Sequence, residues 1–204
     1  MLNEKGGILY MDYTIKHAET EQELDDSLAF AREIFGEHIG LGNREEWLER
    51  MECTNDLLLY AESSGKVVGI VFGYIENNGN MTAGIVAVDE RLRNRGVARE
   101  MMLSLEERAK ARCVHLIALG AAQAAEGFYA KLGYIGSLLI QSEKYGIDEL
   151  LSLNTRYEVR YTNVYDGKIN QVCLDLPEAD RELQLKYETT LPGCATQMMF
   201  WKNI

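Results

Sequence analysis

The chain has 204 residues, of which 47% are hydrophobic and two are prolines. This composition excludes a disordered tail and suffices for one well-buried domain, alone or with a small appendage. The 32 acidic and 21 basic residues give a net charge of -11. A surface of that sign disfavours nucleic acid or an anionic membrane as the main partner, so we expect neither.

Two observations concern the cellular location and the start of the chain. The longest nearly uninterrupted apolar stretch, residues 67–75, is far shorter than the roughly 18 residues of a membrane span, and residues 1–7 lack the apolar core of a signal peptide. We therefore expect a soluble, cytoplasmic protein. Residues 5–7 can be encoded by a purine-rich stretch like a bacterial ribosome-binding site, so we hypothesise that Met11 is the natural start.

The cysteines offer no metal site and no disulfide framework. They are widely and irregularly spaced, without a Cys-x-x-Cys pair, at Cys53, Cys113, Cys173 and Cys194. We interpret each as a free thiol and a small buried or half-buried apolar residue. No other metal-ligand spacing is present, so we expect no metal.

The first elements are a strand and two helices. We expect the strand at residues 13–17. Thr20, followed three residues later by Glu23, forms a capping box that opens a helix. One face of this helix is apolar and contains Leu24, Leu28, Ala31 and Phe35. Asn43 is the expected cap of a second helix over residues 44–51.

The middle of the chain predicts a meander that continues into a strand–helix–strand crossover. Three strand-like runs occupy residues 57–62, 67–76 and 81–88, and the second and third flank an Asn-Gly hairpin signal. The elements expected next are a helix over 96–111, a strand over 114–119, a helix over 123–132 and a strand over 134–140. This order predicts an α/β fold with a mixed sheet.

The last sixty residues form a second set of elements. We expect a helix over 145–153, a hairpin of strands 157–162 and 168–174, a helix that follows Pro177 and ends at 187, and a last strand over 195–201. The predicted organisation is an N-terminal tail (1–12), a main domain (13–142) and a C-terminal α/β extension or small lobe (143–204). The extension is a candidate for closing an acceptor pocket, completing the sheet or forming a homodimer contact. We favour sheet completion, because the last strand is densely apolar.

A basic loop before the central helix is the strongest chemical signal. Residues 91–112 contain seven basic and three acidic side chains within an acidic chain. The free N–H groups and the dipole at a helix N-terminus attract phosphate oxygens. Gly96 and Ala98 leave room for a close approach to the backbone. The alternative is an ordinary solvated loop with surface arginines.

Two motifs decide between these interpretations. Residues 93–98 read Arg-Asn-Arg-Gly-Val-Ala, and residues 128–134 read Phe-Tyr-Ala-Lys-Leu-Gly-Tyr about 35 positions later. In this order, with a helix and a strand between them, they resemble the signatures of the GNAT N-acetyltransferase superfamily. The resemblance covers residues 13–140. It implies an acyl-CoA-dependent N-acetyltransferase that uses acetyl-CoA as co-substrate, with a largely antiparallel sheet whose central strand pair splays apart.

The resemblance also implies roles for particular residues. Backbone groups of Val86, Ala87 and Val88 would hold the thioester and pantetheine, and an N–H near Val88 would stabilise the oxyanion. Tyr129 would protonate the departing CoA thiolate; the alternative is a packed aromatic side chain. The pyrophosphate would be bound by Arg93, Asn94, Arg95, Gly96, Val97, Ala98 and Arg99.

The chain departs from the family pattern at two points. Ala122 occupies the position of an asparagine that helps to hold the cofactor in many relatives, and we assign Gln123 as its substitute. In many relatives a general base lies on one of two strands, which correspond to residues 81–85 and 116–119 here. Neither stretch contains a carboxylate. The base stays unassigned; a water chain or an already neutral amine would also serve.

The acceptor region is strongly acidic. Residues 19–62 contain thirteen acidic and three basic side chains, which would steer a cationic amine toward the protein. Ordinary solvated helix faces are the alternative. The carboxylates of first interest are Glu33, Glu37, Glu45 and Glu46. His38 lies in a loop on this side and stays a candidate, whereas His115 is interpreted as structural.

The main prediction is therefore transfer of an acetyl group from acetyl-CoA to a primary amine of a small cationic molecule. Two alternatives remain. One is a catalytically quiet acyl-CoA sensor or partner-binding module, suggested by Ala122 and the missing carboxylates. The other is acetylation of a peptide or protein. The three differ in turnover and in the size of the acceptor.

Overall fold

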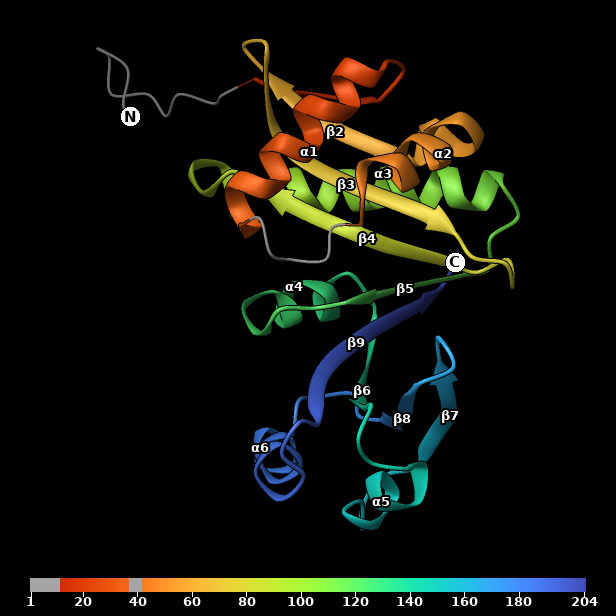
Figure 1. The fold of residues 1–204 in the computed structure, drawn as a ribbon. Helices are drawn as coiled ribbons and strands as arrows, with labels where there is room; N and C mark the ends of the chain where they lie inside the picture. The colour runs from red at the N-terminus through yellow and green to blue at the C-terminus, as the bar shows by residue number, and fades with distance from the viewer. Residues whose placement is uncertain (1–11, 37–41) are drawn as a thin grey trace, which may run out of the picture. The chain divides into compact units, whose positions relative to one another are not determined.

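The computed structural model describes residues 12–36 and 42–204. Met11, Glu37 and His38, named above, lie outside these residues. The chain divides into two compact units, one that ends at His115 and also includes Ile204, and one over Leu116–Asn203. Each unit has its own hydrogen-bonded strands and its own helices (Figure 1). The division into a main domain over 13–142 and an extension over 143–204 remains a prediction.

The first unit is an antiparallel meander with helices on both faces. Its strands pair in the order β1-β2-β3-β4, with bounds Thr14–His17, Leu58–Ser63, Lys66–Ile75 and Met81–Val88. Its helices are α1 (Glu21–Phe35), α2 (Arg44–Thr54) and α3 (Val97–Ala111). In Figure 1, α1 and α2 lie in front of these strands and α3 lies behind them. Short 3-10 turns, η1 and η2, cover Asn55–Leu57 and Glu90–Leu92.

Strand β3 shows why the meander needs helices on both sides. Ile70 and Phe72 are fully buried in a cluster with residues of α1 and α2. Gly69 and Gly73 alternate with them and lie close to Met101 and Leu105 of α3. A strand that is apolar on both faces is stable only when both faces are covered. This packing holds α3, and with it the basic loop, against the meander.

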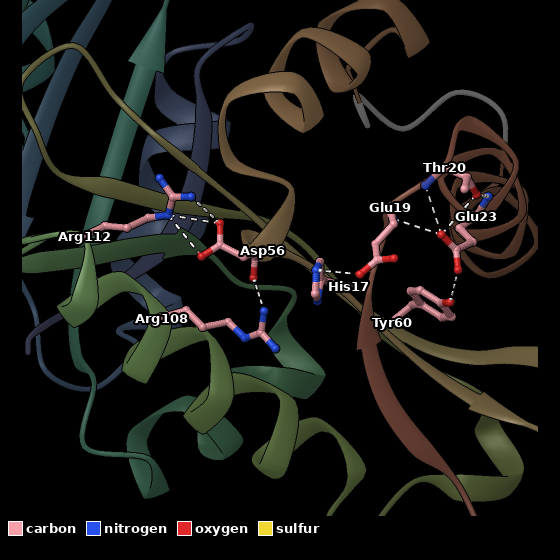
Figure 2. A network of polar contacts seen from close by, with 8 residues as sticks. All are labelled: His17, Glu19, Thr20, Glu23, Asp56, Tyr60, Arg108 and Arg112. Carbon is pink, nitrogen blue, oxygen red and sulfur yellow. Dashed lines mark hydrogen bonds and ion pairs between the residues drawn. The ribbon is translucent and has the colours of Figure 1, made fainter.

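The carboxylate of Glu23 connects α1 with β2. Glu23 Oε2 accepts the backbone N–H groups of Thr20 (3.0 Å) and Glu19 (2.9 Å), which confirms the predicted capping box. Glu23 Oε1 accepts the hydroxyl of Tyr60 on β2 at 2.7 Å (Figure 2). The Tyr60 hydrogen bond, followed by the backbone bonds, lowers the pKa of Glu23.

We expect Glu23→Gln to lower the free energy of unfolding by about 1 kcal/mol at pH 7, the usual value of a helix cap. Because the folded pKa of Glu23 is lowered, its contribution is present above the unfolded value of about 4.3 and is lost as the pH falls through the folded value. The difference from wild type should shrink as the pH falls from about 7 to about 3. Urea denaturation measures it. Glu33→Gln, on the exposed face of α1, is the control and should change stability by less than about 0.5 kcal/mol.

A second polar contact fixes the far end of α3. Arg112 binds the Asp56 carboxylate at 2.6 Å, and Arg108 donates to the Asp56 carbonyl at 3.0 Å (Figure 2). Asp56 lies in η1, directly before β2. The C-terminal end of α3 is therefore tied to the start of the meander.

The second unit is a five-stranded antiparallel sheet. Its strand order is β5-β9-β6-β8-β7, with bounds Leu116–Gly120, Ala195–Asn203, Ile135–Ser142, Ile169–Asp175 and Val159–Tyr165. Its helices are α4 (Glu126–Lys131), α5 (Ile147–Ser152) and α6 (Arg181–Thr190), with a 3-10 turn η3 at Gln123–Ala125. The last strand, β9, lies between β5 and β6. The prediction that it completes a sheet is confirmed.

The predicted fold class is confirmed: helices flank largely antiparallel strands, and the elements occur in the expected order. Within the described residues, no helix is long and apolar enough to cross a membrane. All four cysteines are free, as expected. Cys173 and Cys194 are buried, but Cys53 and Cys113 are exposed, so the interpretation as buried or half-buried residues was wrong for these two. Cys53 lies in α2, and Cys113 lies two residues after the end of α3.

Candidate active site

Strand β4 leads directly into the basic loop. Val86, Ala87 and Val88 pair with residues 69–71 of β3. The Ala87 side chain is buried in the cluster that includes α1 and α2, whereas Val86 is partly exposed. The Asp89 N–H then donates to the Val68 carbonyl at 2.9 Å, where the meander ends. Three of the predicted site residues are thus held rigidly beside the loop.

A bulge interrupts β4 two residues before Val86. Phe72 pairs with Ile85 and the next residue, Gly73, pairs with Ala83, so Gly84 is the extra residue. A Cβ atom at Gly84 would lie 2.9 Å from the Tyr74 ring, which leaves no room for a larger residue. A bulge leaves backbone groups out of the ladder and bends the strand. Sequence reasoning missed this feature, although a glycine inside a strand is a signal for it.

The loop after β4 is shaped by short-range contacts. Asp89 accepts Arg91 Nη2 at 2.6 Å and the Arg91 N–H at 2.9 Å, which starts the η2 turn. Arg93 Nε lies 3.4 Å from the Val88 carbonyl. Asn94 (φ 61°) and Gly96 (φ 90°) have left-handed backbone conformations, which asparagine and glycine tolerate best. The loop thus reverses the chain within a few residues and starts α3.

The first turn of α3 has the properties of an anion site. Gly96 is its N-cap and has no side chain that could cap the free N–H groups of this end. The Val97 side chain is buried and Ala98 is half-buried, so these residues present their backbone rather than their side chains. The surrounding side chains are exposed: Arg93, Asn94, Arg95 and Arg99. Within the described residues, none of these three arginines forms an ion pair.

Asp89, which directly follows β4, is a poor base. The Arg91 side chain, followed by the Arg91 N–H, lowers the pKa of Asp89 to about 2 despite the opposing effect of burial. Asp89 therefore stays ionised and bound to Arg91 at neutral pH. It shapes the loop and does not supply the missing general base.

Tyr129 belongs to the second unit and is almost completely buried. It lies in α4, and its ring packs against Phe128, Tyr134 and Phe200 at centroid distances of 5.1, 6.1 and 5.8 Å. Burial raises the pKa of Tyr129 to about 12. Its hydroxyl has no hydrogen-bond partner among the described residues. The phenol is therefore protonated over the whole physiological range and free to donate to a ligand.

Gln123 and Ala122 lie just before this helix. Gln123 begins the η3 turn and is exposed, and Ala122 precedes it without a capping side chain. Gln123 thus lies in the same unit as Tyr129, six residues before it. Its role as the substitute for the family's asparagine stays a prediction.

Part of the negative charge of residues 19–62 is neutralised by ion pairs within this segment. Arg44 binds Asp25 at 2.6 Å and Glu21 at 2.9 Å. Arg50 stacks on the Trp47 and Tyr74 rings, with its guanidinium carbon 4.3 and 3.9 Å from their centroids. The acidic candidates that the structure describes are exposed: Glu33, Glu45 and Glu46. His17 and His115 lie in the first unit; His17 is 3.3 Å from Glu19 (Figure 2).

The predicted site residues thus fall into two groups. The stretch from Val86 to Arg99 forms one continuous strand, loop and helix start in the first unit, whereas Gln123 and Tyr129 belong to the second. Besides the Gly84 bulge, sequence reasoning missed Phe200, which packs on Tyr129 from β9. No group of His, Cys, Asp or Glu in the described part of the chain is arranged to hold a metal ion.

Comparison with known proteins points to one family. Residues 16–134 match the sequence model described as the acetyltransferase (GNAT) family. Among curated proteins, no sequence matches this chain. Many solved structures share its fold, and three of them, all at low identity, come from Pyrococcus horikoshii, Paenibacillus lautus and Neisseria gonorrhoeae.

The Pyrococcus protein is a putative acetyltransferase with 17% identity and a TM-score of 0.55, over 97% of this chain and 92% of that chain. The Paenibacillus protein is a diaminobutyrate acetyltransferase in complex with L-2,4-diaminobutyric acid and coenzyme A. Its sequence identity is 15% and its TM-score 0.52, and the match covers 84% of this chain and 99% of that chain. The Neisseria protein is an N-acetylglutamate synthase complexed with coenzyme A and N-acetyl-glutamate. Its sequence identity is 13% and its TM-score 0.53, and the match covers 95% of this chain and 35% of that chain.

Proposed function

Because the chain belongs to the acetyltransferase (GNAT) family, we propose that it transfers an acetyl group from acetyl-CoA to the primary amine of a small, cationic molecule. The observation that carries this proposal is the uncapped, arginine-flanked N-terminus of α3 directly after β4. It offers free N–H groups and positive charge to a phosphorylated cofactor. Family membership makes acetyl-CoA the cofactor of choice.

The first unit supplies the cofactor contacts in this proposal. Backbone N–H groups of residues 96–99 and the guanidinium groups of Arg93, Arg95 and Arg99 bind the pyrophosphate. Backbone groups of Val86, Ala87 and Val88 bind the pantetheine and the thioester. The left-handed Gly96 supports this role, because it directs the first turn of α3 without a side chain over the phosphate.

The chemical step is direct transfer. The neutral amine attacks the thioester carbonyl, the C–S bond breaks, and the amine proton goes to solvent, so that an amide and the CoA thiol are formed. A strand N–H near Val88 stabilises the oxyanion, and Tyr129 gives its proton to the departing thiolate. The raised pKa of Tyr129 supports its role as a proton donor. Water would restore the Tyr129 proton after each turnover.

For the acceptor, we propose a small amine attracted by exposed carboxylates such as Glu33, Glu45 and Glu46. We also propose a cytoplasmic location, because the exposed free thiols of Cys53 and Cys113 suit a reducing compartment. Peptide acetylation stays the alternative for the acceptor.

A quiet acyl-CoA sensor is the second candidate function. It is favoured by Ala122, by the lack of an acidic residue within β4 and β5, and by the Arg91 contact that holds Asp89. A sensor would bind acetyl-CoA without transfer to any amine. The two candidates share the cofactor site and differ only in the chemical step.

A thiol-release screen distinguishes these functions. We expect CoA thiol to appear when the protein, acetyl-CoA and one class of amine are combined, among polyamines, amino acids, aminoglycosides and short peptides. Turnover with a small amine supports the main proposal, and turnover with peptides alone supports the alternative acceptor. Saturable acetyl-CoA binding without release for any class contradicts an enzyme and supports the sensor.

A further inference from the structure

Helix α4, which carries Tyr129, is held in place by its surroundings more than by its own sequence. It has six residues, one of which is Gly127, and its N-cap residue, Ala125, makes no side-chain hydrogen bond. Isolated helices shorter than about 12 residues are marginal in water, and glycine weakens them further. Contacts with other elements of the second unit therefore decide where the Tyr129 side chain points.

An ion pair connects the first turn of α4 with α6. Arg181, the first residue of α6, donates from Nη2 to Glu126 Oε2 at 2.6 Å. The Glu126 side chain is only 15% exposed, so its carboxylate is largely removed from water. Such a carboxylate depends on its cationic partner, because loss of the partner leaves a charge that is neither paired nor fully solvated.

Arg181 is itself held by a chain of hydrogen bonds. Its Nη1 donates to Gln184 Oε1 at 2.5 Å, and Gln184, which is almost fully buried, donates from Nε2 to Thr196 Oγ1 at 3.2 Å. The Thr196 hydroxyl donates in turn to Glu188 Oε1 at 2.7 Å. The chain thus joins α4, α6 and the start of β9. A connected network holds a side chain more firmly than an isolated surface ion pair does.

This network reaches Tyr129 from two directions. Glu126 lies three residues before Tyr129, and residues three apart are neighbours on a helix surface. Thr196 lies four residues before Phe200 on the same strand, and the Phe200 ring packs on the Tyr129 ring at a centroid distance of 5.8 Å. The helix that carries the phenol and the strand on which its ring packs are therefore both connected to α6.

We propose that Arg181 is a positioning residue for acetyl transfer: through Glu126 it fixes α4, so that the Tyr129 hydroxyl is held where it protonates the departing CoA thiolate. This inference rests on the proposed function and deepens it. It assigns a task to the C-terminal segment that contains α6, because this helix supports the helix of the proton donor. Arg181 acts on the reaction only through α4.

Kinetics in two backgrounds test this role. Arg181→Ala should lower kcat by about 10- to 100-fold, because a displacement of about 1 Å in a reacting group has an effect of this size. The Kd of acetyl-CoA should stay unchanged, since the proposed pyrophosphate contacts lie in the first unit. In a Tyr129→Phe background, Arg181→Ala should cause no further loss of kcat.

The matched control is Arg156→Ala. Arg156 lies 3.9 Å from Asp180, the N-cap of α6, and its side chain is 76% exposed. The change removes an arginine from the same end of α6 without touching the ion pair with α4. This variant should keep the kcat of wild type.

The outcomes separate this inference from the proposed function. If Tyr129→Phe is as active as wild type, the proposed role of Tyr129 is wrong, and the inference is wrong with it. If Tyr129→Phe is impaired but Arg181→Ala has the kcat of wild type, only the inference is wrong. The same holds if Arg181→Ala lowers kcat equally in both backgrounds, because a purely structural ion pair would act in this way.

Nuclear magnetic resonance of tyrosine labelled with carbon-13 at Cζ tests the same point without turnover. The Tyr129 line is the one missing from the spectrum of Tyr129→Phe. Arg181→Ala should shift this line and lower the pKa of Tyr129 from about 12 toward its ordinary value of about 10, because a displaced α4 admits water to the phenol. The line of Tyr187, a buried residue of α6, should stay in place and shows that α6 is intact. An unmoved Tyr129 line overturns the inference.

Glu126→Ala tests the ion pair from its other member and serves if Arg181→Ala does not fold. It should lower kcat and shift the Tyr129 line as Arg181→Ala does. The double variant should show no larger effect than either single variant, because both changes break the same contact. Circular dichroism checks the fold of all three. Losses of kcat that multiply in the double variant would contradict a shared action through the ion pair.

Discussion

Tyr129→Phe is expected to lower kcat for acetyl transfer by about 100- to 10,000-fold, the range for loss of a positioned proton donor. The substitution removes one oxygen and keeps the ring contacts with Tyr134 and Phe200. Acetyl-CoA affinity should therefore change little. Burial raises the pKa of Tyr129 to about 12, so loss of its proton should not limit the rate below that pH.

The matched control is Tyr187→Phe. Tyr187 is a buried tyrosine of the same unit whose hydroxyl donates to the Leu150 carbonyl at 2.7 Å, and its pKa is also raised to about 12. This change should lower stability by about 1 to 2 kcal/mol and leave kcat unaltered. Stopped-flow or steady-state thiol release measures both variants. Equal activity of Tyr129→Phe and wild type would show that Tyr129 only packs.

The second large effect concerns the anion site of α3. The double variant Arg95→Ala, Arg99→Ala should raise the Kd of acetyl-CoA by about 10- to 100-fold, because charge-assisted hydrogen bonds contribute about 1.5 to 3 kcal/mol. Both side chains are exposed and have no ion-pair partner among the described residues. The fold should therefore tolerate their loss, and the melting temperature without ligand should stay close to that of wild type.

Two controls locate this effect at the phosphates. Lys110→Ala removes an exposed cation from the last turn of the same helix and should leave the Kd unchanged. A short acetyl thioester without the pyrophosphate should react equally well with the double variant and with wild type. If the double variant lost reactivity toward the short thioester to the same extent, the arginines would not act through the pyrophosphate.

Local signals in the sequence predicted most of the secondary structure. The capping box of Thr20 and Glu23 and the cap at Asn43 are confirmed, and each helix begins where its cap predicts. Asn78-Gly79 and Asp166-Gly167 do lie in hairpin turns. These signals act over a few residues, so they are visible without knowledge of the fold.

Contacts between distant residues were not predictable in the same way. Tyr60 reaches Glu23 across 37 positions and Arg112 reaches Asp56 across 56, and neither pair has a sequence signature. Sheet completion by the last strand was favoured among three roles, but its position between β5 and β6 was not predicted, because an apolar strand pattern does not say which strands become its neighbours. Exposure of Cys53 and Cys113 likewise depends on which faces of the structure stay uncovered.

The candidate site was likewise predictable only in part. The motif located residues 93–98, and the sequence alone predicted a helix start after a basic loop. The left-handed Asn94, the Arg91 contact that lowers the pKa of Asp89, and the bulge at Gly84 required the structure. Each depends on backbone geometry that several sequences can adopt.

The most direct test of the account is a calorimetric titration of the wild-type protein with acetyl-CoA. We expect saturable binding of one molecule per chain, and a matching rise in the melting temperature of several degrees once the ligand exceeds its Kd about 100-fold. Absence of any binding near millimolar acetyl-CoA would contradict the assignment of the α3 N-terminus as the cofactor site.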